Sequence, residues 1–259
     1  MRKMSAVLIG CAIVLMTIAT RANEAPRLRI TGSLWAPYVD QSLPNFGLAA
    51  EVVGTGLRRA GYELDPKVET WPRAYKGVAI GVYDVVVGVW ESEARAQDLV
   101  FSAPYLINDV ILLARVDAGI VFDNLADLIG YRIGVVNGYA YGGGFDTYPR
   151  LIRIGNNHLT QNLLLLRQRK IDLVIGDRLS IFYELSRFMP SSRANFRALP
   201  NAHIRRGLRM GVSRKYADST KLIAAFDAAI LAMKEDGTFD AIVEKHTKDL
   251  GLAEPGPNR

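Results

Sequence analysis

The sequence contains very little of the chemistry that metal-dependent or disulfide-linked proteins need. Cys11 is the one cysteine among 259 residues, so the chain can form neither an internal disulfide nor a thiolate metal cluster. The three histidines, His158, His203 and His246, lie far apart and lack the spacing of metal ligands. We therefore expect neither a metal nor a cofactor.

Signatures of common enzyme classes are also absent from the sequence. It contains no HExxH motif of zinc peptidases and no Gly-x-Ser-x-Gly turn of serine hydrolases. Gly142-Gly143-Gly144 lacks the Lys-Ser/Thr that a phosphate-binding loop requires, so a loop at the mouth of a cleft is the preferred interpretation. The residues alone give no reason to expect an enzyme.

The N-terminal segment is typical of a secretory signal peptide. Arg2 and Lys3 precede the uncharged, mostly apolar stretch Ser5–Ala19, and small residues precede a cleavage site after Ala22. The apolar stretch is shorter than the ~20 residues that usually span a bilayer. We predict that residues 1–22 are removed during export to the periplasm.

Two alternatives for this segment stay open. The segment could be retained as an N-terminal anchor. Leu8-Ile9-Gly10-Cys11 is also similar to a lipoprotein box, in which the cysteine is acylated. Apolar residues continue beyond Cys11, which favours a cysteine that fills the apolar region of a signal peptide.

The positive charge of the chain does not indicate a nucleic-acid partner. The formal net charge is +6, from 32 Lys+Arg and 26 Asp+Glu. Three basic residues belong to the predicted signal peptide, so 29 basic and 26 acidic residues remain after cleavage, a net charge of +3. The densest basic stretch, Arg187 to Arg209, has little aromatic interleaving and no nucleic-acid motif. We interpret it as a solvated face.

Short apolar runs alternate with helical patterns after Arg27, which is typical of an α/β protein. The expected strands include residues 28–31, 85–87, 110–113, 133–136 and 173–175. Apolar residues at helical spacing predict a helix over Leu48–Ala60, with Gly61 as its stop. A second such pattern covers Leu222–Met233, and a further helix follows the break at Gly237.

One series of motifs in the mature chain is distinctive. Gly81-Val82-Tyr83-Asp84 is followed by Gly88–Arg95 and by Phe101-Ser102-Ala103-Pro104-Tyr105. Lys170–Asp177 and Lys234–Phe239 continue the series toward the C-terminus. In order and spacing, these segments resemble the periplasmic solute-binding proteins of ABC importers, in the polar-amino-acid group (solute-binding protein family 3).

The resemblance implies a two-lobed α/β fold of the type II periplasmic-binding-protein class, in which two crossing strands join lobes that close over a ligand. Residues 23–114 and 207–259 would form lobe one, with residues 115–206 inserted as lobe two. The crossings are expected near Val110–Arg115 and Gly207–Val212. The sequence agrees in having no Pro- or Gly-rich linker between two independent domains.

The resemblance also implies which charged residues hold the ligand. Arg95 stands where the family binds the α-carboxylate, and a planar guanidinium is suited to gripping a carboxylate with two hydrogen bonds. Ser92 replaces the family's threonine nearby. Asp177 corresponds to the acceptor for the ligand's ammonium group, although it could instead cap the helix that follows. Asp172 is interpreted as structural.

Aromatic residues at the family's site positions suggest a reshaped pocket. Trp35 and Tyr38 follow the first strand, where the family has a ring that stacks on the ligand; core packing is the alternative. Trp90 replaces a small hydroxyl residue, and Gly138-Tyr139-Ala140 replaces a glycine and a hydroxyl pair, whose backbone N–H groups could still bind a carboxylate. Trp71 is interpreted as structural. An aromatic or altered ligand is expected more than an ordinary small polar amino acid.

By resemblance, the protein would capture a small amino-acid-like or carboxylate-bearing ligand and present it, as a monomer, to the membrane subunits of an ABC importer, without catalysis. Two alternatives stay open. Some relatives on this scaffold are periplasmic enzymes, such as cyclohexadienyl dehydratases, and Glu91 is the nearby carboxyl group that could act as a general acid. Other relatives pass their closed state to a membrane receptor as ligand sensors.

Overall fold

The computed structural model describes residues 25–248. The predicted signal peptide, with Cys11 and its possible lipidation, lies outside the described residues. Within them, no helix is long and apolar enough to cross a membrane.

The described residues form one mixed nine-stranded sheet with helices on its faces. The main strand order is β2-β1-β3-β9-β5-β8-β6-β7, and β4 also pairs with β9. The strands are β1 (Arg27–Ser33), β2 (Glu63–Glu69), β3 (Val85–Trp90), β4 (Leu99–Phe101), β5 (Leu106–Arg115), β6 (Arg132–Val136), β7 (Ile152–Asn156), β8 (Leu173–Asp177) and β9 (Phe196–Ser213). The α-helices are α1 (Leu48–Arg59), α2 (Trp71–Ala79), α3 (Glu93–Ala96), α4 (Leu159–Arg167), α5 (Arg178–Phe188), α6 (Ser219–Glu235) and α7 (Thr238–Thr247).

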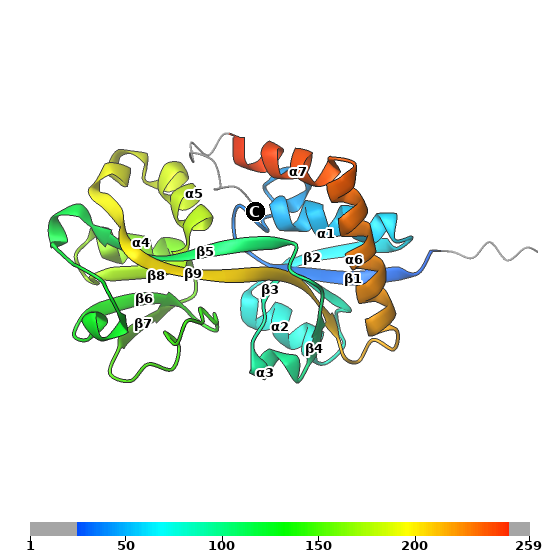
Figure 1. Cartoon of the computed structure of the whole chain (residues 1–259), viewed down its shortest axis with the longest axis horizontal. Coiled ribbons are helices and arrows are strands. Elements are labelled where there is room, and N and C mark those ends of the chain that lie inside the picture. The colour runs from blue at the N-terminus through cyan, green and yellow to red at the C-terminus, as the bar shows by residue number, and fades with distance from the viewer. Residues whose placement is uncertain (1–24, 249–259) are drawn as a thin grey trace, which may run out of the picture.

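The elements divide into two lobes that share two long strands. Figure 1 shows β5 and β9 running side by side along the molecule, and they pair antiparallel from Leu106 opposite Leu208 to Arg115 opposite Phe196. Lobe one holds β1–β4 with α1–α3, α6 and α7, and lobe two holds β6–β8 with α4 and α5 (Figure 1). Because β5 and β9 continue through both lobes, the residue boundaries given above stay a prediction.

Several predicted elements are confirmed. In each of them, burial determines the pattern of apolar residues that the prediction used. All six residues of β3 are buried, as a run of consecutive valines in an inner strand requires. Helix α1 buries its apolar face and ends before Gly61, whose φ of +86° suits the left-handed turn that glycine adopts without strain. Helices α6 and α7 are divided at Gly237, as expected.

Three strand regions that the sequence pattern missed are polar or exposed. Strand β2 lies at one edge of the sheet, pairs only with β1 among the described strands, and contains Pro66, which an edge strand tolerates. Strand β7 forms the opposite edge. Strand β9 extends back to Phe196, well before the expected crossing at Gly207–Val212, and carries exposed residues in this extension. Apolar runs do not reveal strands of this kind.

Helix α1 packs closely on α6 because a glycine faces a buried ring. A Cβ added at Gly56 would lie 3.0 Å from Cε2 of Phe226, whose side chain is fully buried. We expect Gly56→Ala to lower the free energy of unfolding by about 1 kcal/mol, since overpacking of about 1–3 kcal/mol exceeds the ~0.5–1 kcal/mol that alanine gains in a helix. Gly54→Ala is the matched control, because its nearest contact is the flexible end of Arg58 at 3.3 Å. It should stabilise the protein. Equal effects of the two substitutions in urea unfolding would contradict this packing argument.

Candidate functional site

Arg95 is a buried cation at the contact between the lobes. It belongs to the short helix α3 of lobe one and is only 7% exposed. Its Nη1 donates to the carbonyl oxygen of Trp90, and its Nη2 donates to the carbonyl oxygen of Gly138, in lobe two, at 3.0 Å. The guanidinium carbon lies 4.6 Å from the ring centroid of Trp71, a cation–π distance. Arg95 therefore joins the two lobes directly.

The positive charge of Arg95 is only weakly compensated by the groups around it. Among the described residues, it forms no ion pair with a carboxylate, and its hydrogen-bond acceptors are carbonyl groups. Its pKa is lowered to about 10, mainly by burial and in part by the nearby charge of Arg206. The guanidinium therefore stays protonated at neutral pH. Such a buried, planar donor is chemically suited to binding a carboxylate.

Asp177 is the last residue of β8 and caps helix α5. Its Oδ2 accepts a hydrogen bond from the backbone N–H of Ser180 at 2.9 Å, so the capping interpretation is confirmed. The same side chain, 3% exposed, also faces lobe one and the crossing strand β5. The Tyr38 hydroxyl donates to Oδ2 at 3.0 Å, and Nδ2 of Asn108 donates to Oδ1 at 3.0 Å. Whether Asp177 also accepts a ligand ammonium stays a prediction.

The hydrogen bonds around Asp177 form a network that joins the lobes. Asn108 also donates to the Tyr38 hydroxyl at 2.6 Å and accepts from Nε1 of Trp90 at 2.8 Å. Burial raises the pKa of Asp177 to about 6, against the lowering effect of the donors from Ser180, Tyr38 and Asn108. At neutral pH its carboxylate is therefore mostly charged. Because it is buried, the charged form depends on the hydrogen bonds from these donors.

Aromatic rings fill the space between Arg95 and this network. Trp35, Trp71 and Trp90 come from three segments of lobe one, and we call them the tryptophan cage. The Tyr139 ring of lobe two lies against all three, with centroid distances of 6.0, 6.4 and 5.7 Å and interplanar angles of 70°, 82° and 80°. Tyr38 packs beside Trp35 at 4.5 Å. The aromatic residues expected at the site thus lie together.

The turn that carries Tyr139 is fixed by Gly138. The Gly138 carbonyl accepts from Nε1 of Trp71 at 3.0 Å as well as from Arg95, and its φ is +77°. A Cβ at this position would lie 3.0 Å from Cδ1 of Trp71. The positive φ and this close contact both require glycine here. The N–H of Tyr139 donates to the carbonyl of Val136 within the turn. Ala140 follows, half-buried.

The sequence profile of the bacterial extracellular solute-binding proteins, family 3, matches residues 35–249. The chain belongs to this family. The ABC transporter arginine-binding protein 1 of Escherichia coli (strain K12) is 26% identical over 165 residues, which cover 63% of this chain and 65% of that protein. The match thus spans slightly less than two thirds of this relative's length.

Solved structures show the same two-lobed, type II periplasmic-binding-protein fold. AbpA from Streptococcus pneumoniae, an amino acid ABC transporter substrate-binding protein bound to L-arginine, has a TM-score of 0.72 and 17% identity, covering 88% of this chain and 97% of that chain. A histidine kinase sensor domain with similarity to periplasmic binding proteins has a TM-score of 0.71 and 20% identity, covering 90% and 99%. At these identities the likeness concerns the fold alone.

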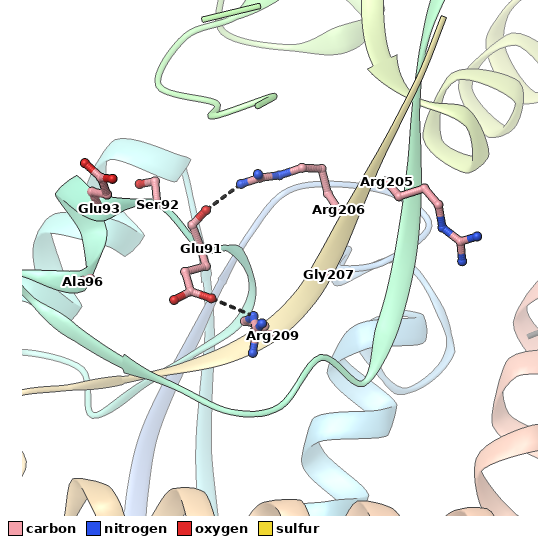
Figure 2. Close-up of a pocket in the computed structure, with 8 residues that line it drawn as sticks. All are labelled: Glu91, Ser92, Glu93, Ala96, Arg205, Arg206, Gly207 and Arg209. Atoms are coloured by element: carbon pink, nitrogen blue, oxygen red, sulfur yellow. Dashed lines mark hydrogen bonds and ion pairs between the residues drawn. The ribbon is translucent and has the colours of Figure 1, made fainter. Parts of the chain in front are cut away.

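In this solute-binding protein, Glu91 lines a hollow of about 430 Å³, together with residues of α3, of the segment just before it and of β9. Figure 2 shows two arginines reaching it: Arg209 Nε lies 3.1 Å from the Glu91 carboxylate, and Arg206 donates to its backbone carbonyl. Ser92 lines the same hollow and caps α3 by accepting from the N–H of Arg95 at 3.4 Å. An exposed, ion-paired glutamate gives no support to the general-acid alternative.

Two residues of the site were missed by the sequence interpretation. Trp71 was interpreted as structural, but it contacts Gly138 in the other lobe and faces Arg95. Asn108 lies two residues before the strand expected at residues 110–113, yet it links three polar groups of the network. A polar residue just before a buried apolar run was the available signal for Asn108.

Proposed function

We propose that this solute-binding protein captures a small amino-acid-like or carboxylate-bearing ligand between its lobes in the periplasm and delivers it to the membrane subunits of an ABC importer. The observation that carries the proposal is the buried Arg95 guanidinium, which lies at the contact of the lobes and has carbonyl oxygens and an indole ring as its neighbours. A ligand carboxylate would supply the charged partner. The arginine-binding names of relatives point to the same ligand class.

The interlobe contacts suggest how binding and closure are coupled. Arg95 meets Gly138 across the lobes, and Tyr38 meets Asp177. A ligand held by Arg95 from lobe one and by Asp177 from lobe two would contact both lobes only when they are closed. Such differential contacts stabilise the closed form, which an importer then recognises.

A thermal-shift panel of amino acids and organic acids tests this proposal. At about a hundredfold excess over Kd, a ligand adds about 2.7 kcal/mol of stability, which for a protein of this size raises Tm by about 5–10 °C. We expect the compounds that shift Tm to share a free carboxylate. The proposal would be contradicted if only compounds without a carboxylate shifted Tm. It would also be contradicted if no compound in a broad panel shifted Tm. Formation of a product from prephenate or arogenate would favour the enzyme alternative.

A further inference from the structure

The tryptophan cage is closed by a side chain of the protein itself. Trp35 follows β1, Trp71 begins α2 and Trp90 ends β3, so three separate segments of lobe one build it. Within residues 25–248, the single ring that contacts all three is Tyr139, which enters from lobe two. All three contacts are edge-to-face in geometry, an arrangement that aromatic pairs prefer.

The Tyr139 ring also lies within the influence of both charged groups of the proposed site. Burial is the main cause that raises the pKa of its hydroxyl; the charge of Arg95 lowers this pKa and that of Asp177 raises it. The ring thus lies among the tryptophans, near the proposed carboxylate-binding and ammonium-binding groups. The Gly138 turn, held by Trp71 and Arg95, fixes its direction.

We propose that Tyr139 determines the specificity of the interlobe site by filling the tryptophan cage and excluding ring-bearing ligands from it. This proposal departs from the expectation, drawn from the sequence, of an aromatic ligand, because the ring of the protein itself occupies the cage. This inference depends on the proposed function in one point only, namely that the ligand is an amino acid. A ligand with a small side group can be held by Arg95 and Asp177 while Tyr139 keeps its place. A ligand with an aromatic side group must displace Tyr139, and this competition lowers its apparent affinity.

Truncation of Tyr139 tests the proposal with p-cresol, the molecule that matches the tyrosine side chain. Tyr139→Ala should create a ring-sized space between the tryptophans, and apolar spaces of this kind bind aromatic compounds. We expect p-cresol to bind Tyr139→Ala at least about tenfold more tightly than the wild type, and to raise its Tm. Because all three tryptophans of the chain form the cage, their fluorescence reports binding locally.

Three variants make the result specific. Tyr139→Thr is a second truncation that is measured together with Tyr139→Ala. If one of the two variants does not fold, the other still tests p-cresol binding. Tyr139→Phe keeps the ring and should bind p-cresol as weakly as the wild type. Tyr148→Ala removes another half-buried tyrosine of lobe two, outside the cage, and should also behave like the wild type. Equal p-cresol affinity in the wild type and both truncated variants, or no binding by either truncated variant, would overturn the proposal.

L-Phenylalanine separates this inference from the proposed function. If Arg95 anchors a carboxylate, Tyr139→Ala should bind L-phenylalanine more tightly than p-cresol, and at least about tenfold more tightly than the wild type does. A gain for p-cresol without a gain for L-phenylalanine would support the assignment of Tyr139 to the cage. The same result would contradict the role of Arg95 in the proposed function.

Discussion

Arg95→Ala is expected to weaken binding of the carboxylate ligand found in the thermal-shift panel by at least about 30-fold. Removing one partner of a buried, hydrogen-bonded charge pair costs about 2–5 kcal/mol, and 2 kcal/mol corresponds to about 30-fold. The variant also removes the hydrogen bond to the Gly138 carbonyl, so its lobes should close less readily. Isothermal titration calorimetry measures the loss of affinity.

Two further variants show whether the geometry or only the charge of Arg95 matters. Arg95→Lys keeps a positive charge but cannot form the two parallel hydrogen bonds of a guanidinium, so we expect intermediate affinity. Arg73→Ala removes an arginine whose side chain is 76% exposed, and it should bind like the wild type. Unchanged affinity in Arg95→Ala would remove this residue from the site.

The wild type is expected to lose about 3 kcal/mol of stability between about pH 3 and pH 7 through Asp177 alone. Its pKa is raised in the folded protein from 3.8 to about 6, chiefly by burial. Between these values the folded state binds the proton and the unfolded state does not, so the free energy of unfolding falls as pH rises. Each pKa unit corresponds to about 1.4 kcal/mol. Asp177→Asn should lack this loss in urea unfolding followed across the pH range.

Asp172 supplies a control with the opposite sign. The hydrogen bond from Arg132 is the main cause that lowers the pKa of Asp172, so its contribution to stability is lost as pH falls, not as it rises. Asp172→Asn should therefore keep the decline between about pH 3 and pH 7. If Asp177→Asn shows the same decline as the wild type, the buried carboxylate does not cause it.

The fold could be predicted from the sequence where burial controls the residue pattern. The consecutive valines of β3 and the apolar face of α1 identify buried elements without further information. Strand β2 could not be found in this way, because it lies at an edge of the sheet and its residues are mainly polar. The early start of β9 was missed for a similar reason, since its first part, in lobe two, carries exposed side chains.

The charged and aromatic residues of the site could be named from the sequence, but not their mutual contacts. Trp71 and Gly138 are far apart in the chain and belong to different lobes, so neither local pattern shows the contact. The packing of Tyr139 among the tryptophans depends on the direction of the Gly138 turn. The capping of α5 by Asp177 was foreseeable, because an aspartate between a buried strand and a helix is a preferred cap.

The central claim, that Arg95 binds the carboxylate of the ligand, is tested most directly by a double-mutant cycle. The affinity of the ligand is compared with that of its primary carboxamide, in the wild type and in Arg95→Ala. We expect the carboxamide to bind the wild type at least about 30-fold more weakly than the acid, and Arg95→Ala to bind both with similar affinity. An equal preference for the acid in both proteins would contradict the claim.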